Sequence, residues 1–141
     1  MRIALTGATG FLGRYLVRHL AAAGHALRCW YRPDSDRGGF DREASALEWL
    51  PGELGDPSAT LALVRGADAL VHAAVQWEGP RNRGRGSHGA ADVFLGVNLT
   101  GSLQLFQAAL EAGVARCVFL STCAVHEVIL DDRPLDEAHP L

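Results

Sequence analysis

The sequence predicts a single α/β domain built on a parallel sheet. Short apolar segments of strand length alternate along the chain with segments of helical periodicity, and this order produces parallel strands joined by right-handed helical crossovers. The chain has 141 residues, 48% of them hydrophobic and 21% charged, which is an ordinary balance for one folded domain. Its 16 glycines are more than such a domain usually carries, and several fall between predicted elements.

The first strand and the first helix are predicted from a change in periodicity. Residues 2–6 form a short apolar run that ends at Gly7. From Phe11 the spacing becomes three or four residues and gives one apolar helix face, made of Leu12, Tyr15, Leu16, His19 and Leu20. We expect this helix to stop at Gly24, because glycine adopts the positive φ of a helix C-terminus at little cost.

The middle of the chain continues the alternation. Residues 26–31 and 47–50 are apolar runs that predict the second and third strands. The polar, glycine-containing segment 33–45 between them is expected to be a loop or a poorly periodic helix. Asp56 and Pro57 then open a second helix, because aspartate is a preferred N-cap residue and proline suits the first helical position.

The second half of the chain repeats the pattern. Residues 69–73 predict a fourth strand, and residues 91–112 form a long helical pattern. Between them, residues 76–89 carry glycines and arginines without periodicity, which predicts a mobile loop. Residues 116–121 predict a fifth strand, which we expect to be buried on both faces, since its apolar and polar residues do not alternate. The tail, 131–137, is acidic and loop-like.

Composition excludes several classes of function. The formal net charge of −3 leaves no basic excess to replace phosphate counterions, so we do not expect nucleic acid as a partner. The chain has no apolar run of about 18 residues and no segment typical of a signal peptide, which predicts a cytoplasmic protein that does not bind or span a membrane. Its six histidines are scattered without metal-ligand spacing, and we expect no metal site.

The three cysteines, Cys29, Cys117 and Cys123, are odd in number and lack Cys-x-x-Cys spacing, which indicates free thiols in a reducing compartment. Cys29 and Cys117 lie in apolar, strand-like runs, where burial is the expected role. For Cys123 we expect packing rather than nucleophilic chemistry, because no base is placed by the sequence to activate it.

Three glycines occupy the junction between the first strand and the first helix. Gly7, Gly10 and Gly13 form a Gly-x-x-Gly-x-x-Gly pattern. At such a junction the first glycine permits the tight turn, the second lets a pyrophosphate approach the backbone, and the third lets the helix pack closely. The free N–H groups and the dipole of the helix favour phosphate at this end. The pattern therefore predicts a dinucleotide site, with a ligand-free glycine turn as the alternative.

The segment 6–13, Thr-Gly-Ala-Thr-Gly-Phe-Leu-Gly, resembles the nucleotide-binding signature of the extended short-chain dehydrogenase/reductases, the NAD(P)-dependent epimerase/dehydratase family. The resemblance implies a Rossmann-type doubly wound parallel sheet of about five strands. Residues 1–141 would then be one NAD(P)-binding domain, the N-terminal part of a longer architecture that ends before the sixth strand. The resemblance also implies cofactor contacts from six residues of this segment: Gly7, Thr9, Gly10, Phe11, Leu12 and Gly13.

Two later segments extend the resemblance. Glu53 and Leu54 match the segment whose acidic residue, usually aspartate, contacts the adenine ring; here glutamate keeps the carboxylate on a longer arm. Ala73 and Ala74 match the segment after the fourth strand, which passes beneath the ribose and the nicotinamide in this family. The resemblance therefore implies that all four residues contact the cofactor.

The catalytic part of the resemblance is incomplete. Asn98 matches the helix asparagine that orders the active site in this family, Ser121 falls in the strand-five segment that meets the cofactor, and Thr122 stands at the catalytic Ser/Thr position. The family's Tyr-x-x-x-Lys pair would fall near position 147, beyond this chain. No internal pair replaces it, because the sequence contains no lysine.

The end of the second strand bears on the choice of dinucleotide. NAD enzymes of this fold usually place an acidic residue there, about 20 residues after the glycine turn, to bind the ribose 2′-hydroxyl. Here Arg32 stands 19 positions after Gly13, and its guanidinium can pair with the 2′-phosphate of NADP. Arg28 is a second candidate for that role. Asp34 could still reach a ribose, so NADP is preferred and NAD remains open.

Two functions are consistent with these observations. The first is the dinucleotide-binding part of an NADP-preferring oxidoreductase or of a nucleotide-sugar epimerase, dehydratase or reductase, which in its full-length form could be a homodimer. The alternative is a non-catalytic NAD(P)-binding sensor or regulatory module of the same fold. A Tyr-x-x-x-Lys pair downstream would favour the enzyme. The small-molecule substrate is not specified by these residues.

Overall fold

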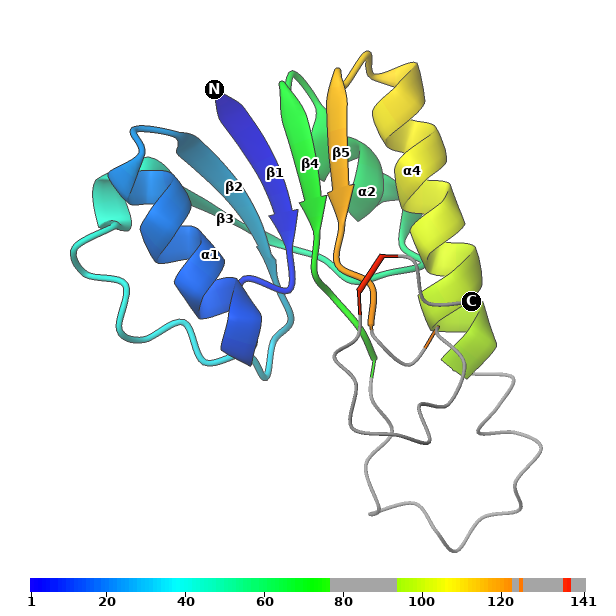
Figure 1. The fold of residues 1–141 in the computed structure, drawn as a ribbon, viewed down its shortest axis with the longest axis horizontal. Helices are drawn as coiled ribbons and strands as arrows, with labels where there is room; N and C mark the ends of the chain where they lie inside the picture. Colours follow the sequence, from blue (N-terminus) through cyan, green and yellow to red (C-terminus); the bar gives the residue numbers. More distant parts are fainter. Residues whose placement is uncertain (77–93, 123–124, 126–135, 138–141) are drawn as a thin grey trace, which may run out of the picture.

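The computed structural model describes residues 1–76, 94–122, 125 and 136–137. In this part of the chain, five parallel strands form one sheet in the order β3-β2-β1-β4-β5 (Figure 1). The strands are β1 (Arg2–Thr6), β2 (Ala26–Tyr31), β3 (Leu47–Pro51), β4 (Ala69–His72) and β5 (Arg116–Phe119). The predicted doubly wound α/β architecture is confirmed, and the strand bounds differ from the predicted ones by no more than two residues.

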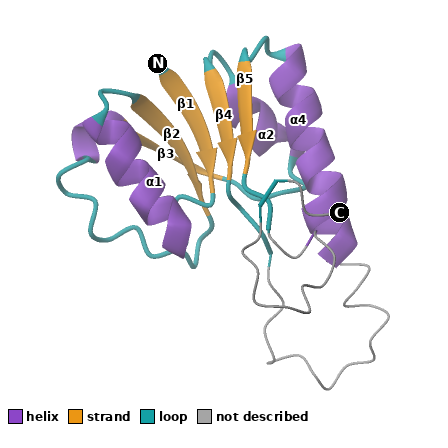
Figure 2. Cartoon of the chain, in the orientation of Figure 1, coloured by secondary structure: helices purple, strands orange, loops and turns teal. Residues whose placement is uncertain are grey.

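Helices cover both faces of the sheet (Figure 2). The helix α1 (Phe11–Ala22) packs on one face, and α2 (Pro57–Val64) and α4 (Gly101–Glu111) pack on the other. A π-helical segment, Gly96–Thr100, leads directly into α4, and a short 3₁₀ turn, Ala44–Ala46, precedes β3. No helix in the described ranges is long and apolar enough to cross a membrane.

The central strands contribute to two separate cores. In β1, Ile3 and Leu5 pack toward α1, whereas Ala4 packs toward α2 and α4. In β4, Val71 packs toward α1 and Leu70 toward the other two helices. Each of these strands is therefore apolar on both sides, which explains why the sequence shows no alternation there.

The apolar face predicted for α1 is only partly right. Leu16 and Leu20 pack against the core beside the fully buried Val17, but Leu12 and Tyr15 are 56% and 53% exposed. The buried face contains Gly13, which lies so close to the Gly7 and Ala8 backbone that a side chain there would not fit. The end of α1 agrees with the prediction, since Gly24 has a φ of +80°.

The long helical pattern is interrupted in a way that the periodicity did not predict. The described part begins at Phe94, passes through the π-helical segment, and continues as α4 to Glu111. Gly113, with a φ of +72°, lies in the turn after the helix, close to the expected end. Residues 91–93 and the predicted loop beyond residue 76 lie outside the described residues, as does most of the predicted tail.

The expected burial of β5 on both faces is wrong. All four of its residues are exposed, and Val118 and Phe119 are each more than half exposed. The reason is its place in the sheet, because β5 is the last described strand in the order and pairs with β4 alone. Cys117, on β5, is exposed for the same reason, against expectation, while Cys29 is buried as predicted. Burial raises the pKa of the Cys29 thiol to about 12, so it stays protonated at neutral pH.

The helix α2 begins as the sequence predicts. One carboxylate oxygen of Asp56 accepts hydrogen bonds from the backbone N–H groups of Ser58 and Ala59, at 2.9 and 3.1 Å, and from the Ser58 hydroxyl at 2.7 Å. These bonds lower the pKa of the Asp56 carboxyl, the Ser58 hydroxyl having the largest effect. The donors at this helix end are thus satisfied within the chain.

Replacing Asp56 with alanine should lower the free energy of unfolding, because the first-turn donors of α2 lose their acceptor. Urea denaturation at neutral pH measures the change. Asp41→Ala, which removes an exposed acid without a capping role, is the control and should change stability far less. Equal effects of the two substitutions would contradict the capping assignment.

Candidate functional site

A cavity of about 460 Å³ opens at the edge of the sheet where the parallel strands end. The β1–α1 turn forms one wall, and the segments that follow β2, β3 and β4 form the others. Strands β1 and β4 are neighbours in the sheet, yet the next described helices, α1 and α4, lie on opposite faces. A crevice between strands whose connections diverge is where open α/β sheets bind ligands.

The glycines of the β1–α1 turn are required by close contacts. Gly7 has a φ of +75°, and a Cβ atom there would lie 2.6 Å from the Ala73 carbonyl carbon. A Cβ on Gly13 would overlap the Gly7 carbonyl oxygen. Around Gly10 the same test finds only the Gly7 oxygen, at 3.2 Å, and Gly10 lines the cavity. The predicted tight turn at Gly7 and close helix packing at Gly13 are therefore confirmed.

Replacing Gly13 with alanine should lower the free energy of unfolding by about 1–3 kcal/mol, because the added methyl group pushes α1 away from the turn. Gly96→Ala is the matched control, since that glycine is also helical and has nothing within 4 Å of the added atom. Thermal denaturation of both variants measures the difference. A Gly13 variant as stable as the control would show that the close approach is not required.

The amino-terminal ends of α1 and α2 differ in how their donors are satisfied. No side chain in the described part of the chain caps α1, which begins after Gly10 and has no acidic residue in its first turn. Phe11, Leu12 and Gly13, whose N–H groups have no partner within the helix, all line the cavity. This end of α1 therefore presents unpaired donors and the positive end of the helix dipole, which favour an anion.

A buried chain of hydrogen bonds holds the floor of the cavity. The Thr6 Oγ1 atom accepts from the backbone N–H groups of Ala73 and Ala74, at 3.2 and 3.1 Å, and lies 2.7 Å from His72 Nδ1. On the other side of the ring, His72 Nε2 lies 2.8 Å from Ser102 Oγ, and the Ser102 hydroxyl donates to the Asn98 carbonyl oxygen. The chain thus links β1, β4 and the helix that starts with the π-helical segment.

The donors and acceptors of this chain define the protonation of His72. The Ser102 hydroxyl donates its proton to the Asn98 carbonyl oxygen, so toward His72 it can only accept, and His72 Nε2 carries the ring proton. His72 Nδ1 then accepts from the Thr6 hydroxyl. Burial lowers the pKa of His72 to about 4, which agrees with a neutral ring.

Protonation of His72 should destabilise the fold in a defined pH window. Its pKa is about 4 in the folded chain and 6.5 when unfolded, so the unfolded state binds more protons between these values. Stability should therefore be full above pH 6.5 and fall on the order of 3 kcal/mol from this group as the pH drops to 4. Urea denaturation at several pH values measures the slope.

Replacing His72 with glutamine should remove this part of the slope, whereas His19→Gln, at an exposed position on α1, should keep it. Should the His72 variant fail to fold, the ring nitrogen shifts of the unaltered protein give the same information. A Nδ1–H tautomer, or a charged ring at pH 6, would contradict the proton assignment.

Asn98 fixes the chain that leaves β4. Its side-chain oxygen accepts from the Gln76 N–H at 2.7 Å, and its amide nitrogen donates to the Gln76 carbonyl at 3.0 Å. Gln76 lines the cavity, whereas Asn98 is not among the lining residues that the structure describes. Asn98 therefore acts on the cavity through Gln76.

The far end of the cavity lies beside β2 and β3. Arg32 lines it, with 51% of its side chain exposed, and its Nε atom lies 3.7 Å from an Asp34 carboxylate oxygen. Arg28 is held elsewhere, because its guanidinium binds Glu48 at 2.8 Å and the Arg65 carbonyl at the end of α2 at 2.7 Å. The expectation that Arg28 assists Arg32 is therefore wrong.

Most of the predicted cofactor-binding residues are brought together by the fold. Eleven of them line the cavity: Gly7, Thr9, Gly10, Phe11, Leu12, Gly13, Arg32, Glu53, Leu54, Ala73 and Ala74. Ser121 and Thr122 are exposed beyond β5 and are not among its described lining residues. The Thr122 carbonyl accepts from the Val125 N–H at 3.4 Å. Cys123 lies outside the described residues.

Sequence reasoning missed several residues at the site. Trp30, Ser35, Val75, Gln76 and Val97 also line the cavity. They follow strands or sit near them, so the rule that ligands bind at the carboxyl ends of strands could have pointed to those after β2 and β4. Within the described residues, no group of three or more potential metal ligands occurs.

Comparison with known proteins identifies the family. The model of the NAD dependent epimerase/dehydratase family matches residues 3–140. The chain belongs to this family. The match spans both the glycine turn and the strand-five segment, so the family expected from these motifs is confirmed.

Two reductases resemble this chain over most of its length. A ceramide reductase from Caulobacter vibrioides is 36% identical over 130 residues, covering 92% of this chain and 37% of that protein. A 4-hydroxy-2-methyl-3-oxo-4-farnesyl-3,4-dihydroquinoline-1-oxide ketoreductase from Stigmatella aurantiaca is 33% identical over 145 residues, covering 100% of this chain and 39% of that protein.

The fold of the family is also seen in solved structures. A dTDP-glucose 4,6-dehydratase from Streptomyces venezuelae, solved with NAD bound, aligns with a TM-score of 0.80 and 30% identity, over 100% of this chain and 45% of that one. The chain therefore spans less than half the length of these relatives.

Proposed function

We propose that this chain binds a nicotinamide dinucleotide in the cavity, as the cofactor-binding part of an oxidoreductase. The observation that carries the proposal is the uncapped end of α1, whose unpaired N–H groups line the cavity beside Gly10. Because α2 satisfies its own donors with Asp56, the difference between the two helices supports an anion at α1. The pyrophosphate would lie there, with the adenosine toward Glu53 and Leu54.

We further propose that the preferred dinucleotide is NADP. Arg32 is the charged residue at the end of β2 that lines the cavity, and no acidic residue takes the place usual in NAD enzymes. Its guanidinium is half exposed and only loosely paired with Asp34, so it is free to turn toward a 2′-phosphate. Bidentate pairing of arginine with phosphate supplies the selectivity.

The chemistry we propose is reduction of a carbonyl group. A bound nicotinamide dinucleotide supplies a hydride, and Thr122 would hold the substrate oxygen. Thr122 follows β5, which ends at the same edge of the sheet as the cavity because all the strands are parallel. The names of two relatives, a ceramide reductase and a ketoreductase, support carbonyl substrates that carry apolar chains. The acid/base pair would come from outside residues 1–141.

A non-catalytic NAD(P)-binding module is the alternative, and it needs only the cavity. A Tyr-x-x-x-Lys pair beyond Leu141 would favour the enzyme, and its absence from the natural protein would favour the sensor. The cytoplasmic location and the homodimer expected from the sequence stay predictions.

Replacing Arg32 with alanine should weaken NADP binding about tenfold or more, because a charge-assisted pair is lost, and should change NAD binding less than about threefold. Isothermal titration calorimetry with both dinucleotides measures the two affinities. Arg42→Ala removes an exposed arginine from the same β2–β3 connection, away from the cavity, and is the matched control. Equal losses for NADP and NAD would remove Arg32 from the selectivity.

A further inference from the structure

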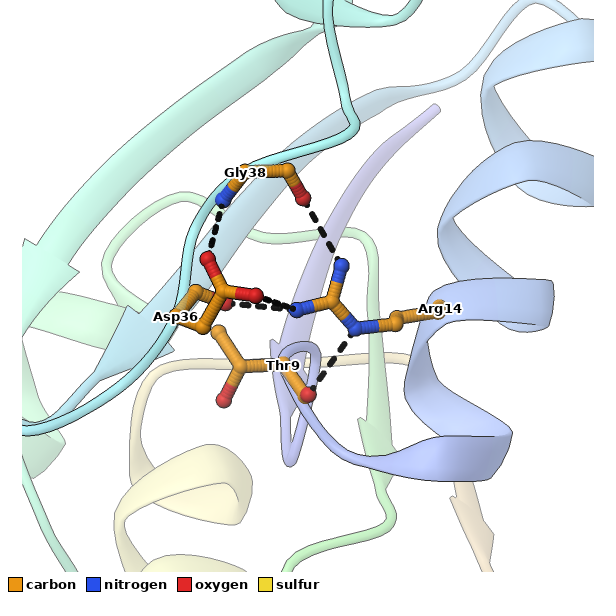
Figure 3. Close-up of polar contacts among 4 residues, drawn as sticks. All are labelled: Thr9, Arg14, Asp36 and Gly38. Atoms are coloured by element: carbon orange, nitrogen blue, oxygen red, sulfur yellow. Dashed lines mark hydrogen bonds and ion pairs between the residues drawn. The ribbon is translucent and has the colours of Figure 1, made fainter.

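One side chain ties the β2–β3 connection to the glycine turn. Arg14, in the first turns of α1, donates from Nε to the Thr9 carbonyl at 3.3 Å and from Nη1 to the Gly38 carbonyl at 2.7 Å. Its Nη2 atom donates to Asp36 twice, to the main-chain oxygen at 2.7 Å and to the carboxylate at 3.1 Å. Figure 3 shows the guanidinium between these three partners.

The arrangement needs a guanidinium. All three nitrogen atoms of Arg14 donate, in three directions within one plane, which a lysine ammonium on a flexible stem cannot reproduce. The guanidinium carbon also lies 5.0 Å from the centre of the buried Phe40 ring. Arg14 is only 25% exposed and is not among the described residues that line the cavity. Its contacts are therefore to the chain and not to a ligand in the cavity.

The segment that Arg14 holds carries the residues at the ribose end of the cavity. Arg32 and Ser35 both line the cavity and are joined by two hydrogen bonds, from the Arg32 N–H to the Ser35 hydroxyl and from the Ser35 N–H to the Arg32 carbonyl. Asp36 accepts from the Gly38 N–H at 2.8 Å, which closes the next turn. Anchoring at Asp36 and Gly38 therefore positions the turn that contains Arg32.

The Arg14 side chain and its hydrogen bonds to Thr9, Asp36 and Gly38 form a clamp, and its other end is the glycine turn. Thr9, whose carbonyl Arg14 binds, lies between Gly7 and Gly10 and lines the cavity. In a dinucleotide only a few bonds separate the pyrophosphate from the 2′ position of the adenosine ribose, so the distance between them is confined to a narrow range. The clamp joins the protein segment that would meet the pyrophosphate to the segment that would meet the 2′-phosphate. It therefore sets the distance between the two segments before the ligand binds, and less conformational entropy is lost on binding.

We propose that Arg14 is a positioning residue for dinucleotide selection: it holds the Arg32–Gly38 turn at the distance from the glycine turn that suits a 2′-phosphate. The inference rests on the proposed dinucleotide function. Without the clamp, the turn is free to move, and Arg32 has to be ordered at the moment of binding. The loss should therefore fall on the ligand that needs Arg32, which is NADP, and much less on NAD.

Two substitutions separate positioning from charge. Arg14→Met removes a positive charge, so long-range electrostatics alone would weaken binding of the extra phosphate. Asp36→Asn removes a negative charge, so electrostatics alone would strengthen it. Positioning predicts that both substitutions weaken NADP. Whichever way the amide introduced by Asp36→Asn is turned, its NH₂ group faces a donor, either Arg14 Nη2 or the Gly38 N–H.

The measurement is the ratio of NADP to NAD affinity, by calorimetry, for the unaltered chain, the two variants and a control. Arg18→Met is the control, because Arg18 lies one turn further along α1, is exposed, and has no polar partner among the described residues. The ratio should fall about tenfold in Arg14→Met and severalfold in Asp36→Asn, and should be unchanged in Arg18→Met. Arg14→Lys should not restore it.

Each outcome decides the inference. A ratio that rises in Asp36→Asn while falling in Arg14→Met would show that charge, and not positioning, is responsible. An unchanged ratio in both variants, with binding retained, would overturn the role of Arg14 and leave the proposed function standing. Absence of dinucleotide binding by the unaltered chain would instead overturn the proposed function and the inference together. Asp36→Asn keeps the test open should Arg14→Met not fold.

Discussion

The close contact between the segment after β1 and the segment after β4 is the constraint on which the rest of the site depends. At this point the Gly7 backbone lies so close to Ala73 and Ala74 that a side chain would not fit, and the Thr6 hydroxyl accepts hydrogen bonds from both alanines. The two segments are therefore joined by contact and by hydrogen bonds at once. The turn that follows Gly7 leads into α1, and the segment that follows Ala74 forms the floor of the cavity.

A chain of buried hydrogen bonds through His72 fixes how the segments after β1 and β4 lie relative to each other. His72 is fully buried, and each of its nitrogen atoms has one hydroxyl partner, Thr6 or Ser102. An apolar residue of the same size would remove the acceptor of the Thr6 hydroxyl proton and the ring donor to the Ser102 oxygen. Losing these partners of buried polar groups would destabilise the fold. The chain also reaches the π-helical segment through Asn98, so the helix on one face of the sheet and the turn on the other are positioned by connected bonds.

Local sequence patterns predicted the local elements of this structure, but they did not predict contacts between residues far apart in the sequence. Apolar runs predicted β1 and β4 well, because both strands are buried on two faces, but the same kind of run in β5 gave the wrong burial, since a run does not reveal which strand lies at the edge. The glycine turn was predicted because its spacing is local. The hydrogen bond from Thr6 to His72 joins residues 66 positions apart. Arg14 binds Asp36 and Gly38, which lie 22 and 24 positions further along the chain. No local sequence pattern marks such pairs.

The central claim is that the uncapped end of α1 receives the pyrophosphate of a dinucleotide. A titration of the ¹⁵N-labelled chain with NADP, followed by amide chemical shifts, tests it most directly. The account predicts large shifts for the amides of Phe11, Leu12 and Gly13, and none for Ser58 and Ala59, which the Asp56 carboxylate already binds at the start of α2. Shifts confined to other parts of the chain, or equal shifts at the two helix ends, would contradict it.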